Sequence, residues 1–159
     1  MKISGKIITI LLLACCALTA GAQKMSDADA IKAVLEKETK AFNEIDYKTW
    51  SDTWAHTPYA FWSFADTTDV NSFSGWDTID GGFSDYFKTS KASTAKIDRV
   101  WHEIKVFGNG AYVRFTQKVY DDTERPAQAQ VRVLEKIKGQ WKIVCVTVIA
   151  IEKENRPKL

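Results

Sequence analysis

The chain has 159 residues, and its 22 Lys and Arg nearly balance its 20 Asp and Glu. This length allows one domain of ordinary size, and the balanced charge gives no sign of a nucleic-acid or anionic-membrane partner. Six Trp residues, within an aromatic content of 12%, exceed the need of a small core. They indicate a pocket or an interface.

The first 22 residues have the pattern of a secretion signal peptide. Basic residues precede an apolar run, and Ala20-Gly21-Ala22 fits the small residues of a cleavage site. We expect cleavage before Gln23, export to the bacterial periplasm or medium, and a mature domain over residues 23–159. The apolar run is too short for a membrane span, so no membrane partner is expected after cleavage. The alternative, a lipoprotein anchored at Cys15, is disfavoured because apolar residues follow that Cys instead of a polar tether.

Two helices are expected at the start of the mature chain. Ser26 or Asp27 caps the first helix, which carries a mostly apolar stripe at helical spacing. The stripe contains Ile31, Val34, Leu35, Glu38, Phe42 and Ile45. A second helix, "YKTWSDTWA", begins after Asp46 and places Trp50 and Trp54 on one face.

A strand, a loop and a third helix are expected next. The strand covers residues 59–65, the loop 66–72 and the helix 76–87. Ser74-x-x-Asp77 resembles a capping box at the start of this helix. Gly81-Gly82 weakens the helix prediction, because glycine is a poor helix former.

The C-terminal half is predicted to be strand throughout. The segments are 97–107, 111–120 and 128–150, and the last is divided by a turn at Lys138-Gly139. Helices followed by a meander of antiparallel strands predict an α+β fold, with the helices packed on one face of a curved sheet.

Two turns set the predicted registers. A two-residue loop at Asn109-Gly110 pairs Lys105 with Arg114, and one at Lys138-Gly139 pairs Ile137 with Gln140 and therefore Arg132 with Cys145. The first hairpin then has an aliphatic face of Val100, Ile104, Val106, Val113, Phe115 and Val119. Its other face, which mixes aromatic and charged residues, contains Trp101, Glu103, Lys105, Tyr112, Arg114 and Thr116. In the second hairpin, the mixed face contains Arg132, Leu134, Trp141, Ile143, Cys145 and Thr147.

The turn between these hairpins leaves two alternatives open. A turn of odd length places Arg114 and Arg132 on one face, whereas an even length separates them. We expect the helices to cover the mixed face and to enclose a pocket lined by Trp, Tyr and Arg. The aliphatic face is too apolar to remain in water, so we expect a homodimer through it, with Phe115 in the contact.

Four stretches resemble the nuclear transport factor 2-like superfamily, in its SnoaL-like branch: "AFNEIDYKTW", "FSGWDTIDGGFSDYF", "AYVRFTQ" and "VRVLEKIKGQWKIVCV". The pattern is similar to the association domain of calcium/calmodulin-dependent kinase II. The resemblance implies a cystatin-like cone with a cavity at its open end, dimerised through the sheet, in which Arg114 and Arg132 line the cavity. This chain departs from the kinase-type pattern, so that pocket's chemistry does not carry over whole. The kinase-type pattern has His where this chain has Glu103, Lys105, Cys145 and Thr147.

Binding of an anionic or polar ligand is the role that arginines within strands favour. A buried guanidinium stays charged and needs a carboxylate, phosphate or carbonyl as its partner. The predicted ligand contacts are Arg114, Arg132, Glu103, Tyr112, Trp101, Trp50, Trp54 and Trp62. The alternative is a structural ion pair in which Glu103 neutralises Arg114, and each aromatic residue alone is more often a core residue.

We therefore expect an exported homodimer that binds a small anionic or polar molecule, with no cofactor. The alternative is a SnoaL-like isomerase, cyclase or hydratase that acts without a metal on a small cyclic substrate. We assign no catalytic residue, since "AFWSFA" lacks the acid that ketosteroid isomerase relatives use there. His56 and His102 have no companions at metal-ligand spacing. Signal cleavage leaves Cys145 as the sole Cys, which we expect to be a buried, inert thiol.

Overall fold

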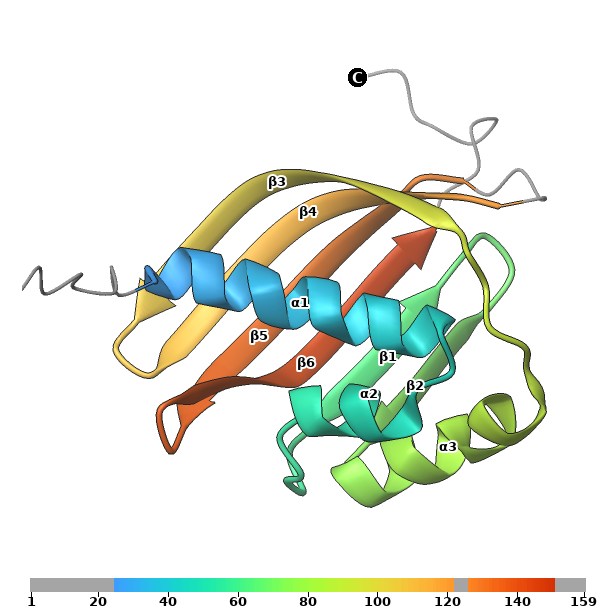
Figure 1. Cartoon of the computed structure of the whole chain (residues 1–159), viewed down its shortest axis with the longest axis horizontal. Coiled ribbons are helices and arrows are strands. Elements are labelled where there is room, and N and C mark those ends of the chain that lie inside the picture. Colours follow the sequence, from blue (N-terminus) through green and yellow to red (C-terminus); the bar gives the residue numbers. More distant parts are fainter. Residues whose placement is uncertain (1–24, 122–125, 151–159) are drawn as a thin grey trace, which may run out of the picture.

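Three helices lie on one face of a curved six-stranded sheet in the computed structural model, which describes residues 25–121 and 126–150 (Figure 1). The helices are α1 (Asp27–Asn43), α2 (Tyr47–Thr53) and α3 (Trp76–Thr89). The strands are β1 (Phe61–Ala65), β2 (Val70–Ser74), β3 (Lys96–Phe107), β4 (Gly110–Tyr120), β5 (Gln128–Ile137) and β6 (Gln140–Ala150). The predicted α+β architecture is confirmed. The signal peptide and its cleavage point lie outside the described residues.

The sheet joins the two halves of the chain. Its strand order is β2-β1-β6-β5-β4-β3, and only the β1–β6 pair is parallel. β6, the last strand of the C-terminal meander, therefore lies between β1 and β5, and the three helices all cover what we call the inner face (Figure 1). Within the described residues, no helix is long and apolar enough to cross a membrane.

The first two helices begin where the sequence predicts. The Ser26 side chain accepts a hydrogen bond from the Asp29 backbone N–H at 3.1 Å, and the Asp46 side chain accepts one from Thr49 N–H at 3.0 Å. Such N-caps satisfy backbone donors that the helix itself leaves free. The predicted capping box of α3 is wrong, because Gly75 precedes this helix and no side chain caps it.

One strand of the sheet was not predicted from the sequence. Residues 70–72 fall in the predicted loop, but Val70–Ser74 form β2 at the edge of the sheet. Only Phe73 of this strand is partly buried, and it packs on Trp62 at a ring separation of 5.4 Å. An exposed edge strand buries too little to impose an alternating apolar pattern, so the usual sequence signal is absent.

One turn follows the prediction and the other is displaced. Lys138-Gly139 forms the predicted two-residue loop, with φ values of 49° and 81°, and pairs Ile137 with Gln140. The first turn is Gly108-Asn109 rather than Asn109-Gly110, and it pairs Phe107 with Gly110. Gly108 has a φ of 58°, which glycine adopts without steric cost at the first position of a two-residue hairpin loop.

Two β-bulges change which side chains share a face. A register shift between Trp101 and Glu103 places Trp101 opposite Phe115, not with Glu103. Another between Val133 and Leu134 places Arg132 opposite Val146, and Cys145 falls on the outer face. Each bulge adds one residue to one strand, so the alternation of its side chains is reversed from that point.

The predicted orientation of β4 is wrong. Val113 and Phe115 are 0% and 2% exposed beneath the helices, whereas Arg114 projects from the outer face. Val113 pairs with Arg132 of β5, so Arg132 lies on the inner face and the two arginines are on opposite sides of the sheet. Of the two alternatives for the turn between the hairpins, this arrangement corresponds to the even length, which separates Arg114 from Arg132. The aliphatic face of the first hairpin is thus largely the one that the helices bury, and Phe115 is a core residue.

The two adjacent glycines of α3 give a matched test of how α3 packs against Phe73 of β2. A Cβ on Gly82 would lie 2.6 Å from the Phe73 ring, whereas a Cβ on Gly81 would meet nothing within 4 Å. We expect Gly81→Ala to raise the free energy of unfolding by about 0.5–1 kcal/mol, because alanine is the better helix former. Gly82→Ala is expected to lower it by about 1–3 kcal/mol through the clash. Urea denaturation of both variants measures the difference, and equal changes would contradict it.

Candidate functional site

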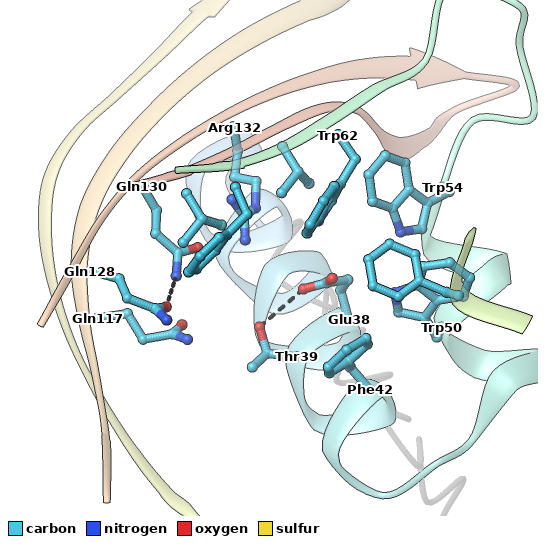
Figure 2. A pocket seen from close by; sticks show the side chains of 14 residues that line it. Glu38, Thr39, Phe42, Trp50, Trp54, Trp62, Gln117, Gln128, Gln130 and Arg132 are labelled. Carbon is cyan, nitrogen blue, oxygen red and sulfur yellow. Dashed lines mark hydrogen bonds between the residues drawn. The ribbon is translucent and has the colours of Figure 1, made fainter. Parts of the chain in front are cut away.

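A cavity of about 150 Å³ lies between the helices and the inner face of the sheet (Figure 2). Aromatic and polar side chains contribute equally to its walls, and the polar groups come from one side of α1 and from β4 and β5. The aromatic lining residues are Phe42, Trp50, Trp54, Trp62, Phe64 and Phe83. The polar ones are Glu38, Thr39, Gln117, Gln128, Gln130 and Arg132.

Arg132 is the central charged group of the cavity wall. Its side chain leaves β5 on the inner face and is only 4% exposed. Nη1 donates a long hydrogen bond of 3.4 Å to the Val131 carbonyl, and Nε has no partner. Among the described residues, no carboxylate oxygen lies within 4.0 Å of this guanidinium. Burial lowers the pKa of Arg132 to about 10, and attraction to Glu38 offsets only part of this effect.

Glu38 is the carboxylate of the cavity. It lies on the buried side of α1, is 8% exposed, and accepts a hydrogen bond of 3.0 Å from the Thr39 hydroxyl. Glu38 was expected on the apolar stripe of the first helix, but no role was predicted for it. A carboxylate on a stripe that packs into a core is itself a signal for a polar site, because an unpaired buried charge is costly.

Further polar atoms in the wall are also unsatisfied. Gln130 donates to the Gln128 amide oxygen at 2.8 Å, but its own amide oxygen is buried without a partner. The indole N–H of Trp54 is likewise unpaired. Buried polar groups are hydrogen-bonded in most native proteins, so this cluster, together with Arg132 Nε, is consistent with a site that a polar molecule completes. The glutamines were not predicted, although the alternation in "QAQVR" places them on the same face as Arg132.

Half of the predicted ligand contacts lie at this cavity. Trp50, Trp54, Trp62 and Arg132 line it, as Figure 2 shows. Trp101 is on the inner face but packs on Phe115, at a ring separation of 5.0 Å, and does not line the cavity.

The other three predicted contacts are on the outer face. They are Arg114, Glu103 and Tyr112. Arg114 and Glu103 form the ion pair that was the alternative interpretation, with an N–O distance of 3.5 Å and side chains 49% and 32% exposed. These residues share one face as predicted, but the helices cover the opposite face of β4, so they do not reach the cavity.

Metal ligands do not gather anywhere in the described part of the chain. Residues 25–121 and 126–150 contain no group of three or more His, Cys, Asp or Glu side chains that could hold an ion. His56 instead stacks on Trp76 at 4.1 Å, and His102 contacts the Thr116 hydroxyl at 2.7 Å.

The sequence over residues 31–147 matches the model of the SnoaL-like domain. The chain belongs to this family. No protein with a curated description matches it in sequence. The resemblance seen in the sequence is therefore confirmed for the family.

Solved structures of the nuclear transport factor 2-like (NTF2-like) family share the fold of this SnoaL-like protein. One is a proposed calcium/calmodulin-dependent protein kinase type II association domain from Thiobacillus denitrificans, with 13% identity, a TM-score of 0.62, and coverage of 76% of this chain and 94% of that one. A candidate dehydratase of the NTF2-like family from Streptomyces avermitilis has 15% identity, a TM-score of 0.61, and coverage of 79% and 96%. A candidate ketosteroid isomerase from Parabacteroides distasonis has 15% identity, a TM-score of 0.56, and coverage of 77% and 88%. At these identities the similarity establishes the fold alone.

Proposed function

We propose that this SnoaL-like protein binds a small anionic molecule in the cavity, and that Arg132 holds its acid group. The observation that carries the proposal is a guanidinium that is only 4% exposed and has a donor without a partner. A carboxylate would satisfy this group by accepting two parallel hydrogen bonds from the planar guanidinium. Trp54 also lines the cavity, and its indole N–H is a further donor without a partner.

The remaining wall limits the size and character of the ligand. Trp50, Trp62 and Phe42 offer flat apolar surfaces, which suit an aromatic, alicyclic or short aliphatic body. A cavity of about 150 Å³ accommodates a molecule near the size of benzene. We therefore favour small carboxylic acids over extended or polymeric ligands.

A second candidate function follows from Glu38. A buried carboxylate on the wall that also holds Arg132 could accept a proton from a bound substrate, as an isomerase, cyclase or hydratase requires. The dehydratase and isomerase candidates among the structural neighbours make this alternative worth testing. Recovery of the bound acid unchanged favours the binding protein. Chemical conversion that Glu38→Gln abolishes favours the enzyme.

The test is calorimetric titration with a panel of small carboxylates, from acetate to benzoate. We expect at least one acid to bind the parent and raise its Tm, since a ligand stabilises the state that it binds. Arg132→Met should weaken binding roughly 10- to 100-fold, the equivalent of a hydrogen bond to a charged group.

Arg114→Met is the matched control. It removes the same side chain from the opposite face of the sheet and should bind like the parent. Equal losses in the two variants, or no acid that binds the parent, would contradict the proposal.

Export and dimerisation remain part of the proposal. The signal pattern of residues 1–22 motivates export, and N-terminal mass analysis that shows a lipidated Cys15 would contradict it. For the homodimer we favour the outer face, where Val100, Tyr120 and Ile149 are 60%, 45% and 39% exposed. Sedimentation of the purified protein as a monomer at micromolar concentration would exclude a stable dimer.

A further inference from the structure

Arg99 is a second guanidinium on the inner face of the sheet. It leaves β3 opposite Gln117 and donates from Nε to the Gln117 amide oxygen at 2.8 Å. Nη2 donates to the Thr39 hydroxyl. A guanidinium has five N–H donors, so three remain for another acceptor after these two bonds. No ion pair joins Arg99 to a carboxylate of the described residues.

Arg99 and Arg132 flank the same aromatic ring. Their guanidinium carbons lie 5.3 and 5.4 Å from the centre of Phe115, so they are separated by at most the sum of these distances. Burial lowers the pKa of both, and the charge of Arg99 lowers that of Arg132 further. Glu38 is a source of attraction for each. Glu36 is a second source of attraction for Arg99. Among the described residues, neither guanidinium forms an ion pair with a carboxylate, so both keep donors for a charged acceptor.

Arg99 also lies at the boundary between the cavity and a neighbouring groove. An open groove of about 530 Å³ lies beside the C-terminal half of α1 and is lined by Arg99, Lys40 and Ile97, among others. Thr39 lines both the groove and the cavity, and Gln117 lines the cavity. The hydrogen bonds from Arg99 to Thr39 and Gln117 therefore form the partition between them. Arg99 is accessible from the groove while its contacts belong to the cavity wall.

We propose that the ligand carries two acidic groups, one held by Arg132 inside the cavity and the other by Arg99 at the partition. This inference rests on the proposed function and narrows its ligand class to short dicarboxylates. A dianion would occupy free donors on both guanidinium groups with charged acceptors. A monoanion would leave the donors of Arg99 without a charged acceptor.

The experiment compares acids that share a carbon skeleton but differ in one carboxylate: succinate with butyrate, and phthalate with benzoate. Calorimetric titrations use the purified parent, Arg99→Met, Arg99→Lys, and Arg114→Met as the control on the outer face. For the parent we expect at least one dicarboxylate to bind about tenfold or more tightly than its partner acid. Arg99→Met should remove this preference and change the affinity for the monocarboxylate less than about threefold, with Arg99→Lys in between.

The outcomes separate this inference from the proposal on which it rests. If monocarboxylates bind through Arg132 but the parent shows no preference for dicarboxylates, the second acidic group is refuted and the proposed function stands. An equal loss of both acids in Arg99→Met assigns Arg99 a structural role only. If no acid of either kind binds the parent, both ideas fail together. Loss of the preference in Arg114→Met would also overturn the assignment to Arg99.

Discussion

Replacing Trp50 with alanine is expected to lower the free energy of unfolding by about 3–5 kcal/mol, as for other large aromatic residues in cores. Trp50 is 1% exposed, and its ring lies within 4.9 Å of Phe87, 5.5 Å of Phe83 and 5.6 Å of Trp76. It therefore joins α2 to α3 and supports one wall of the cavity. Truncation to alanine would leave a void next to the existing cavity, and relaxation of the neighbouring side chains could fill little of it.

The control is Tyr59→Ala, which truncates an aromatic residue that is 57% exposed. Its hydroxyl donates to Glu135 at 2.7 Å, but an exposed contact of this kind contributes little, and we expect a loss of no more than about 1 kcal/mol. Guanidinium denaturation, followed by tryptophan fluorescence for Tyr59→Ala and by circular dichroism for Trp50→Ala, measures both. Similar losses in the two variants would mean that Trp50 does not join the helices.

The parts of the fold that local chemistry determines were predictable. Ser26 and Asp46 mark helix starts because their side chains satisfy backbone donors within three residues. The Lys138-Gly139 turn was predictable because a positive φ in a two-residue loop favours glycine. The family resemblance added the order of helices and strands, which these local signals leave open.

The orientation of the strands was not predictable in the same way. Each face of β4 contains a large aromatic residue that suits a core, with Tyr112 on one face and Phe115 on the other. The displaced turn does not decide between them, because it shifts the pairing by two positions and leaves Glu103, Lys105, Tyr112 and Arg114 on one face in either register. Which of the two faces the helices cover depends on tertiary packing, which has no local sequence signal. Arg114 was therefore predicted in the cavity, although it lies outside.

The residues of the candidate site were likewise predicted only in part. Trp50, Trp54 and Arg132 were predicted, because buried aromatic residues and a strand arginine stand out in any register. Glu38 could have been found from its place on the apolar stripe of α1. Arg99 could also have been found, because strand alternation places it on the same face as Trp101, two residues later.

The charge balance of the cavity leads to the prediction for Arg132. Burial lowers the pKa of Arg132 from the ordinary value of arginine to about 10 in the folded protein. The folded state therefore holds the proton less tightly than the unfolded state. The charged guanidinium destabilises the fold at every pH below about 10, and this contribution diminishes only as the pH rises from there toward the unfolded value.

Arg132→Met should consequently raise the free energy of unfolding of the ligand-free protein by about 1–3 kcal/mol at neutral pH, while it removes carboxylate binding. Methionine retains most of the apolar stem, and Glu38 keeps Arg99 as a cation that attracts it. Chemical denaturation without ligand gives the free energy, and Arg114→Met, at an exposed ion pair, should stay within about 0.5 kcal/mol of the parent. If Arg132 instead neutralises Glu38 as a structural partner, its loss leaves that carboxylate buried, and stability should fall by about 3–5 kcal/mol. A fall of that size, together with no carboxylate that raises the Tm of the parent, would show that the arginine serves the core and not a ligand.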